Sequence, residues 1–465
     1  MKPFEPFGKG IKRDMMIRDE IGKQFLAIDV FAISIKYLVE NLMKIVNQRL
    51  VGKLLPTDIG LVLTAPAIWS DASKQFMREA AIKAGIDNDN LRIALEPEAA
   101  SIYCRHLPLD AQTSETDLAI SNLPIGTKYM VLDAGGGTID ITVHEVQESN
   151  TLREVRAANG GAWGGTLVNK AFEDFLREIV GDMVIESFKM KDTEDWLYMS
   201  LQFEAKKRQI EIKSPRYITF RLPLSLIELC ERLNGMHIRD AVAASKYAEI
   251  VDIVRDKLKL SKVVFFYMFG QTLQRTVDHV KFLFRETTIR EVDIILMVGG
   301  FSESQLLQQT LKEAFPNKEI VVPFNPSSCV LRGALMYGHT PLTINGRILK
   351  YKYGVDSCID FKEAHHPDKK KINTDAGLCC KDNFIIFLAK NTVVKSNDTN
   401  IKKQFTTVKK YQKAMAFNCF LSEKTNPSYV DEDGCLKIGK IQIYLDNPDD
   451  RLDRTVSVSM AFGDT

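Results

Sequence analysis

The sequence lacks three features that would assign it to common classes of protein. No run of apolar residues approaches the ~20 that a membrane-spanning helix needs, and Met1–Lys9 has no apolar core of the kind found in a signal peptide. No Cys-x-x-Cys pair occurs among the eight cysteines, and their spacing matches no zinc pattern. The net charge of only +2 gives no general signal for nucleic acid. We therefore expect no membrane span, no nucleic-acid partner and reduced thiols, in the cytoplasm or, as an alternative, also in the nucleus.

The composition and texture of the chain predict several folded parts. A chain of 465 residues with 45% hydrophobic content can bury a large core, and its length suggests about two to four domains. Up to residue 345, short apolar strands alternate with amphipathic helices, which predicts an α/β region. Beyond it, strands separated by Lys-, Asp- and Asn-rich loops predict a β-rich domain, with Thr340–Gly346 as the linker. We place the domain boundaries at 1–122, 123–345 and 346–465.

Local patterns also predict individual helices. An apolar stripe predicts a helix from Asp29 to Val51, with Asp29 as a candidate N-cap. The stretch from Val251 to Arg285 is predicted to be mostly helical. Ser302 and Gln305 have the spacing of a capping box for a helix that runs to Phe315.

The stretch from Tyr129 to Val146 is the feature around which the chain is organised. The apolar run Tyr129–Leu132 predicts a buried strand that ends at Asp133, and the alternation from Ile139 to Val143 predicts a second strand. Between them lie Gly135–Gly137. Glycine permits positive φ and lets backbone N–H groups approach a ligand, so this turn can bind phosphate oxygens in an anion nest, and Asp133 at its mouth can hold a hydrated Mg²⁺. Taken alone, the pattern fits a plain glycine-rich hairpin turn equally well.

The motif Asp-x-Gly-Gly-Gly-Thr-x-Asp, from Asp133 to Asp140, resembles the second phosphate loop of the actin/hexokinase/heat-shock ATPase superfamily. Further motifs occur in the order found in that superfamily: Glu96–Ala100 upstream, Met297–Ser302 downstream, and then Asn325-Pro326 followed by Gly333-Ala334. Together they resemble the 70-kDa heat-shock chaperone family. The segment Trp163-Gly-Gly and the phenylalanine at 301 are most similar to an atypical branch of that family. The resemblance covers roughly residues 28 to 345 well and the remainder weakly.

The resemblance implies an α/β fold with a two-lobed, actin-like (ribonuclease H-like) ATPase domain and a C-terminal β-rich, substrate-binding-like domain. It implies ATP or ADP with Mg²⁺ as cofactors. It also implies protein partners, namely unfolded or extended apolar peptide segments and cochaperones, and a role in the stress response. In the family, the nucleotide state changes the grip of the second domain on the peptide.

The resemblance also assigns roles to individual residues. Asp133, Glu96 and Thr138 are the implied catalytic residues, and Asp140 joins Asp133 and Glu96 in the implied metal set. The implied cofactor-binding residues are Gly135, Gly136, Gly137, Thr138, Gly164, Gly165, Glu204, Lys207, Arg208, Gly299, Gly300 and Ser302. Structural alternatives remain open: Glu96 can be a first-turn acid that complements a helix dipole. The set Glu204, Lys207 and Arg208, which shares one helix face, can be an ordinary exposed charged helix.

Departures from the family pattern bear on affinity and hydrolysis. Phe301-Ser302-Glu303 stands where members usually carry Ser-Thr-Arg, so the stacking arginine is absent and Arg208 is left as the stacking candidate. The family's first phosphate loop, an Asp-x-Gly-Thr-Thr hairpin, and the catalytic lysine that follows it have no counterpart. No spacing supports Lys2, Lys9, Lys12 or Arg13 as a replacement. We therefore expect an incomplete first lobe with an unpaired apolar sheet edge, and weak hydrolysis.

Three functions stay open at this point. The leading one is an ATP-binding, heat-shock-70-like protein with a weak ATPase and nucleotide-coupled partner binding. The second is a non-hydrolysing pseudo-ATPase that acts as a scaffold or regulatory interaction protein. The third is a sugar or metabolite kinase of the same superfamily, which would need a sugar-binding set of Asp, Asn and Glu that we cannot identify.

Overall fold

The chain folds into two compact units. The structure, a computed structural model, describes residues 11–19, 22–50, 54–107, 112–113, 120–395, 401–446 and 448–462. Unit 1 comprises Met1–Val143 and Asn159–Pro341, and unit 2 comprises His144–Ala158 and Leu342–Thr465. The second unit therefore begins close to the predicted boundary at 346, and it also includes a short piece from the middle of the sequence.

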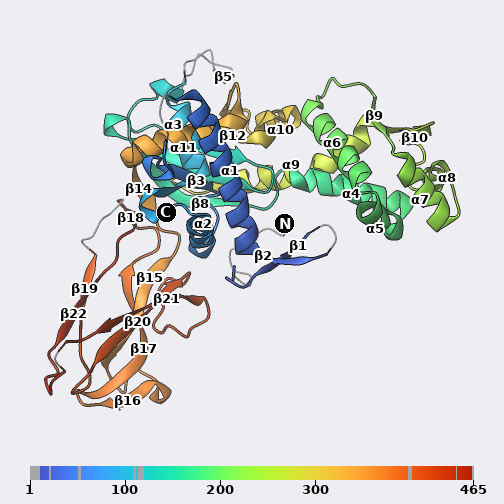
Figure 1. Cartoon of the computed structure of the whole chain (residues 1–465). Helices are drawn as coiled ribbons and strands as arrows, with labels where there is room; N and C mark the ends of the chain where they lie inside the picture. Colours follow the sequence, from blue (N-terminus) through green and yellow to red (C-terminus); the bar gives the residue numbers. More distant parts are fainter. Residues whose placement is uncertain are drawn as a thin grey trace. The chain divides into compact units, whose positions relative to one another are not determined.

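Unit 1 is a mixed α/β structure, as the sequence predicts (Figure 1). Its helices are α1 (Ala27–Arg49), α2 (Asp71–Lys83), α3 (Glu96–Cys104), α4 (Thr166–Val180), α5 (Asp182–Lys191), α6 (Thr193–Gln209), α7 (Leu224–Asn234), α8 (Ile238–Ala244), α9 (Lys262–Leu283), α10 (Gln305–Ala314) and α11 (Cys329–His339). Its strands are β1 (Met16–Arg18), β2 (Gln24–Leu26), β3 (Leu61–Ala65), β4 (Leu91–Leu95), β5 (Gln112–Thr113), β6 (Lys128–Ala134), β9 (Tyr217–Arg221), β10 (Val251–Val254), β11 (Lys257–Ser261), β12 (Ile294–Val298) and β13 (Glu319–Pro323). The chain passes between the units within β7 (Ile139–Val146) and β8 (Leu152–Gly161).

The sheet that positions the candidate site in unit 1 has the strand order β7-β6-β12-β13-β5. β12 pairs in parallel with both β6 and β13, and every residue of β12 is buried. Buried parallel strands carry near-continuous apolar runs, which is why both strands could be recognised from the sequence. The register pairs Asp133 with Val298, so the carboxyl ends of β6 and β12 meet at one edge, where ligands bind in open α/β sheets.

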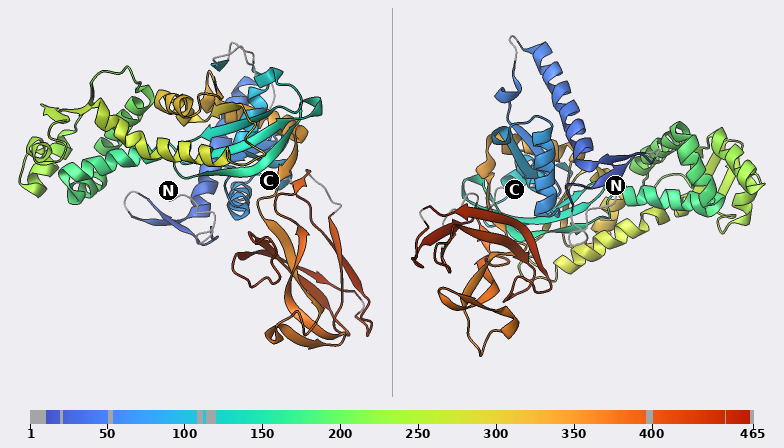
Figure 2. Two further views of the ribbon diagram at one scale, coloured as in Figure 1. Left: turned by 180° about the vertical axis from the view of Figure 1, so that it is seen from behind. Right: turned by 60° about the horizontal axis from the view of Figure 1, so that its bottom comes forward.

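A helical region with many phenylalanines makes up another part of unit 1. It contains α4 to α9 and the three-stranded sheet β10-β11-β9 (Figures 1 and 2). The rings of Phe172 and Phe203 stack at 4.2 Å, and Phe203 lies 5.4 Å from Phe265. These rings are buried and tie α4, α6 and α9 together.

The first lobe has a small sheet, in which β3 and β4 pair in parallel. Among the described residues β4 is the one ladder partner of β3, as expected for an unpaired edge. The helix α1 packs through Ile35 against α2, while Ile33, Tyr37 and Leu38 on its other side are about two-thirds exposed.

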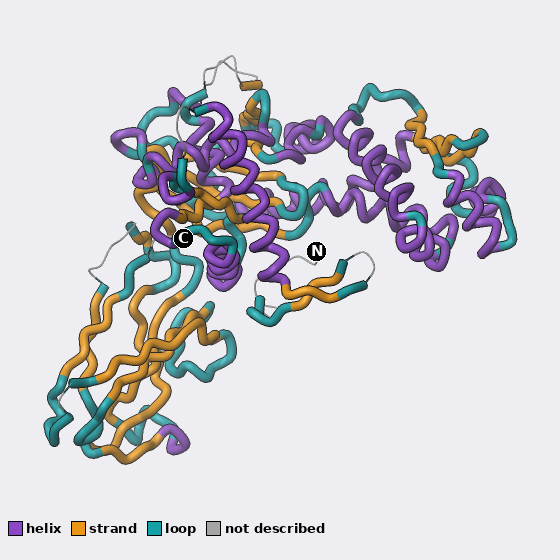
Figure 3. Tube along the Cα trace, in the orientation of Figure 1, coloured by secondary structure: helices purple, strands orange, loops and turns teal. Residues whose placement is uncertain are grey.

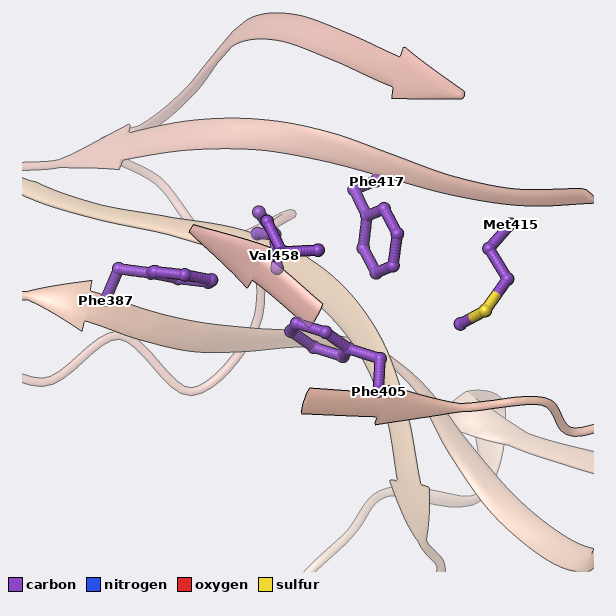
Figure 4. Packing of buried hydrophobic residues seen from close by; sticks show 6 residues of the cluster. Phe387, Phe405, Met415, Phe417 and Val458 are labelled. Atoms are coloured by element: carbon purple, nitrogen blue, oxygen red, sulfur yellow. The ribbon is translucent and has the colours of Figure 1, made fainter. Parts of the chain in front are cut away.

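Unit 2 is almost entirely strand and loop (Figure 3). Its strands, besides β8, are β14 (Ile344–Ile348), β15 (Lys352–Asp360), β16 (Lys371–Thr374), β17 (Gly377–Leu388), β18 (Val393–Val394), β19 (Lys402–Thr406), β20 (Ala414–Ser422), β21 (Cys435–Tyr444) and β22 (Thr455–Ser459). A five-stranded sheet has the order β16-β17-β15-β20-β21, and β19 pairs with β22. A core of Val355, Phe387, Phe405, Met415, Phe417 and Val458 fills the space between these two layers (Figure 4). The prediction of a β-rich C-terminal part is confirmed.

Several local predictions are wrong. The stretch Val251–Arg285 is not mostly helical, because it begins with the hairpin β10–β11 before α9. Asp29 does not cap α1, since the N-cap position is Leu26 and Asp29 lies within the first turn.

The capping box and the linker also differ from prediction. Ser304, not Ser302, caps α10, and its side chain accepts a hydrogen bond from Leu307 N. The predicted linker Thr340–Gly346 is not a plain linker, because it contains a 3₁₀ turn and the start of β14. No described helix combines the length and apolar character that crossing a membrane requires.

Candidate functional site

The glycine loop Gly135–Gly137 joins β6 to β7 and has its carbonyl groups bound on one side. Gly165 N donates to Gly135 O at 3.1 Å, Gly164 N donates to Gly137 O at 3.4 Å, and Thr166 donates to Gly136 O through both its N–H and its Oγ1, each at 2.8 Å. The segment before α4 therefore holds all three carbonyl groups of the loop.

The N–H groups of the loop are the part left over for a ligand. Gly135 N closes the turn by donating to Thr138 O at 2.9 Å. Among the described residues, no acceptor lies within hydrogen-bond reach of Gly136 N or Gly137 N, and both glycines are exposed. A Cβ at Gly137 would have nothing within 4 Å. Unpaired backbone N–H groups beside open space are the donor set that phosphate oxygens need.

The prediction that these glycines serve through positive φ is wrong, because none of the three has φ in the left-handed region. The glycine requirement lies instead in the segment behind the loop. A Cβ at Gly164 would lie 2.6 Å from both Gly135 O and Gly136 O. Gly164 is thus needed for the close approach that fixes the loop, which sequence reasoning had assigned to cofactor contact.

Three carboxylates gather beside the loop: Asp133 at the end of β6, Asp140 in β7 and Glu96 at the first position of α3. Asp133 and Asp140 are buried. Ile68 N donates to Asp140 Oδ1 at 2.8 Å, which fixes that side chain from the first lobe. Burial, together with the charge of Asp140, raises the pKa of Asp133 to about 7. Burial and the charges of Asp133 and Asp140 raise the pKa of Glu96 to about 8.

The turn after β12 brings a second pair of glycines to the same edge. Gly299 has φ +86°, and a Cβ there would lie 2.3 Å from Asp133 Oδ1 and 2.5 Å from Ala134 O. Glycine is therefore required at 299 by both its conformation and its contact with the carboxylate. Gly300 opens the 3₁₀ turn that follows, whereas Ser302 is buried and its Oγ donates to Val298 O at 2.6 Å. Its hydroxyl braces this turn, and its predicted role in binding a cofactor stays a prediction.

The predicted adenosine residues lie on α6, but their cations differ in freedom. Lys207 is 5% exposed, and its Nζ donates to Gly165 O at 3.1 Å and to Asn169 Oδ1 at 2.9 Å. It also pairs with Glu204 at 2.6 Å. Arg208 Nε pairs with Glu204 at 3.0 Å, and its side chain is 57% exposed. Lys207 therefore anchors the turn behind the glycine loop, and Arg208 remains the cation able to reach a ligand.

Phe301 takes the place next to this anchor. Its ring is buried, stacks on Phe269 at 6.3 Å and lies 6.0 Å from Lys207 Nζ. A Cβ at Gly165 would lie 3.0 Å from the ring. Gly165 is thus needed for packing against Phe301.

Sequence reasoning missed the supporting residues Ile68, Asn169 and Thr166. Their contacts with Asp140, Lys207 and Gly136 join residues 30 or more positions apart. A local pattern carries no signal for such contacts.

The donor set fits a hydrated Mg²⁺ with a nucleotide phosphate. Among the described residues, no group of three or more His, Cys, Asp or Glu side chains is close enough to hold a bare metal ion. Mg²⁺ usually keeps several waters and is bound through one or two carboxylates together with substrate phosphates. Asp133, Asp140 and Glu96 have raised or crowded charge that a cation would relieve.

These pKa values predict proton release on binding. At pH 7 the ligand-free site holds protons on Glu96 and partly on Asp133, and a bound cation favours the charged carboxylates. Calorimetry of Mg·ADP binding in buffers of different ionisation enthalpy should show protons released at pH 7 and fewer at pH 9. Glu96→Gln should remove part of the release, and unchanged release in this variant would contradict the assignment.

The same shifts predict the pH dependence of stability. The folded pKa values lie above the unfolded ones, so the unfolded state binds fewer protons between about pH 4 and pH 8. The free energy of unfolding of the ligand-free protein should therefore fall as pH rises through that window. Glu96→Gln should raise the melting temperature at pH 8 relative to the parent chain, and a lowered value would contradict the buried carboxyl as the cause.

A second candidate site is a groove of about 540 Å³ within unit 2. Phe405 of β19, Met415 and Phe417 of β20, and Ile385 of β17 form its apolar floor. The Phe405 and Phe417 rings lie 4.9 Å apart, and Figure 4 shows them with Met415 between the layers. Polar lining residues include Asp356, Lys381, Asp382, Lys403 and Gln412. Pockets of roughly 300–1,000 Å³ with apolar walls and a few polar groups are typical ligand sites.

Comparison with known proteins decides the family. The family profile described as "Hsp70 protein" matches residues 7–443. The chain belongs to the Hsp70 family. It is 30% identical to heat shock 70 kDa protein 12A of Mus musculus over 96% of this chain and 73% of that protein. It is 28% identical to heat shock 70 kDa protein 12B of Homo sapiens over the same shares. Identity to the mitochondrial heat shock 70 kDa protein of Pisum sativum is 27%, over 60% of this chain and 35% of that protein.

The Hsp70 relationship confirms the resemblance to the atypical branch and the α/β fold with an actin-like ATPase domain. The chain is thus an Hsp70-like ATP-binding protein, since members of the family bind ATP and ADP, generally with Mg²⁺. The glycine loop and its carboxylates are where that site is predicted.

Proposed function

We propose that Mg²⁺ with ATP or ADP binds at the glycine loop of unit 1, that hydrolysis there is slow, and that binding is coupled to a protein partner held by unit 2. The observation that carries the nucleotide part is the loop Gly135–Gly137, with two exposed N–H groups lacking acceptors beside three carboxylates. Hydrolysis of a nucleotide phosphate requires mainly positioning and charge neutralisation, which this arrangement can supply in part.

The residues divide the work by position. The N–H groups of Gly136 and Gly137 hold phosphate oxygens, and Asp133, Asp140 and Glu96 hold the hydrated cation through its waters. A bound Mg²⁺ neutralises phosphate charge. Asp133, ionised at neutral pH when the cation is present, orients a water. Hydrolysis is slow because the family's first phosphate loop and its lysine have no counterpart in the sequence.

The partner part rests on the groove in unit 2. Its apolar floor between two layers suits the side chains of an extended or unfolded segment. A chaperone role in the stress response, with cochaperones as further partners, belongs to this proposal. The free state of all eight cysteines supports a reducing compartment such as the cytoplasm.

A second candidate function is a non-hydrolysing, nucleotide-sensing scaffold. The observation that favours it is the burial of Lys207 and Phe301 at the predicted adenosine side. Lys207 Nζ is already bound to Gly165 O, Asn169 and Glu204, so this site has fewer free groups for ribose and base.

Calorimetry of Mg·ATP and Mg·ADP binding, with single-turnover hydrolysis on the same sample, separates these functions. Binding with measurable turnover supports the ATPase, and binding without turnover supports the scaffold. Asp133→Asn should weaken Mg-dependent nucleotide binding by about 10–100-fold, the usual effect of losing a group that acts through a metal-bound ligand. The exposed Asp252→Asn is the matched control in unit 1. Unchanged affinity in Asp133→Asn would sink the assignment of Asp133.

A further inference from the structure

One side of the groove in unit 2 carries a strip of lysines. The strip consists of Lys402, Lys403, Lys409, Lys410 and Lys413, and the stretch 402–413 contains no Asp or Glu. All five residues are exposed. Lys403 lines the groove directly, and Val408 and Gln412, which also line it, alternate with the other lysines of the loop after β19. The strip therefore forms part of the rim of the groove.

The positive charge of this strip is not neutralised locally. Among the described residues, none of the five ammonium groups lies within ion-pair distance of a carboxylate. By contrast, Lys370 in the same unit pairs with Asp382 at 2.9 Å and with Asp431 at 2.5 Å.

The acidic residues nearest the groove are already engaged. Asp356 accepts hydrogen bonds from Asn418 N at 2.7 Å and Asn418 Nδ2 at 2.5 Å. Asp375 accepts from the backbone N of Lys410 at 2.8 Å. The rim on the β19 side thus keeps a net positive field next to an apolar floor.

We infer that the groove selects extended protein segments in which apolar residues are flanked by Asp or Glu. The apolar side chains contact Phe405, Met415 and Phe417, and the flanking carboxylates lie against the lysine strip. This inference rests on the proposed function, because it specifies which partners the groove takes. Apolar burial gives the affinity, and the charges select among apolar segments and speed their association.

A polyanion without apolar residues is the competing occupant. A nucleic acid or an anionic lipid surface would use the lysines and leave the floor of the groove uncovered. The position of the strip along the mouth of an apolar groove favours the mixed segment, since both surfaces are then used at once.

The test is fluorescence anisotropy with the full chain, Mg·ADP present, and three labelled peptides. The first has a leucine-rich centre with glutamates at both ends, the second has lysines in place of the glutamates, and the third keeps the glutamates but has a serine centre. We expect the first peptide to bind about tenfold more tightly than the second, from a few exposed charge pairs. The preference should shrink at high salt, because salt screens exposed charges.

A pair of charge-reversal variants locates the effect. Lys409→Glu/Lys410→Glu should invert the preference, whereas Lys437→Glu/Lys440→Glu, with the same change in net charge on exposed β21, should leave it unchanged. Equal binding of the first two peptides, or of the first and third, overturns the inference while partner binding stands. If no peptide binds to a protein that still binds Mg·ADP, the proposed partner binding itself fails, and the inference with it.

Discussion

Gly136→Val should abolish Mg·ATP binding while the protein stays folded. The side chain would project where the loop N–H groups meet phosphate oxygens, and affinity should fall by at least ~100-fold, or ~2.7 kcal/mol. The fold should tolerate the change, because Gly136 has no positive φ and a Cβ there lies 3.9 Å from its nearest neighbour, Thr166 Cγ2. Calorimetry with Mg·ATP and a thermal melt of the ligand-free protein measure the two effects.

Two further glycine variants sharpen that result. Gly137→Ala adds a single methyl in open space, so it should also weaken binding and leave the melting temperature of the ligand-free protein unchanged. Gly164→Ala should instead destabilise the fold, since its Cβ would lie 2.6 Å from two carbonyl oxygens. Tight Mg·ATP binding by folded Gly136→Val would contradict the phosphate role of the loop. A large drop in the melting temperature of Gly136→Val would make the glycine structural.

The sequence was sufficient to find the glycine loop because its signals are local. The apolar run before Asp133 and the alternation after Thr138 lie within twenty residues, and strands report themselves through such periods. The groups that fix the site are not local: Ile68 N reaches Asp140 over 72 positions, and Lys207 reaches Gly165 over 42. Only the folded chain shows that Lys207 holds a turn.

The missed hairpin β10–β11 had a signal that a neighbouring one concealed. Val251, Ile253, Leu258 and Leu260 alternate with polar residues, as strands do. Arg255 sits between them with φ +59°, at a turn that the sequence does not mark with glycine. The long apolar helix that follows extended the helical interpretation backward over the hairpin.

The capping of α10 shows how tertiary structure chooses between equal local signals. Ser302 and Ser304 are both good N-cap residues. The glycine turn after β12 pulls Ser302 into a 3₁₀ turn, where its hydroxyl donates to Val298 O. Ser304 is left to cap the helix.

Gly333→Ala should be among the most destabilising single-methyl changes in unit 1. The helices α3 and α11 cross at this residue, and a Cβ there would lie 1.6 Å from Ala99 O and 2.3 Å from Ala99 C. Backbone atoms cannot rotate away as a flexible side chain can, so the two helices must separate. The crossing is tightly packed, since Ala99, Ala100 and Cys329 are fully buried. Overpacking of such a core typically costs about 1–3 kcal/mol or more, which a denaturant titration would measure.

The same change should reach the nucleotide site, because α3 begins with Glu96. Moving α3 away from α11 shifts Glu96 relative to Asp133, so a folded Gly333→Ala protein should also bind Mg·ADP more weakly. It should release fewer protons on binding, since the pKa of Glu96 near 8 depends on its burial. Gly270→Ala is the matched control: it lies in the middle of α9, is exposed, and its Cβ would have nothing within 4 Å. Helix propensity alone should make Gly270→Ala stabilising by about 0.5–1 kcal/mol. If the two variants shifted stability in the same direction, contact at the α3–α11 crossing would not be the reason for glycine at 333.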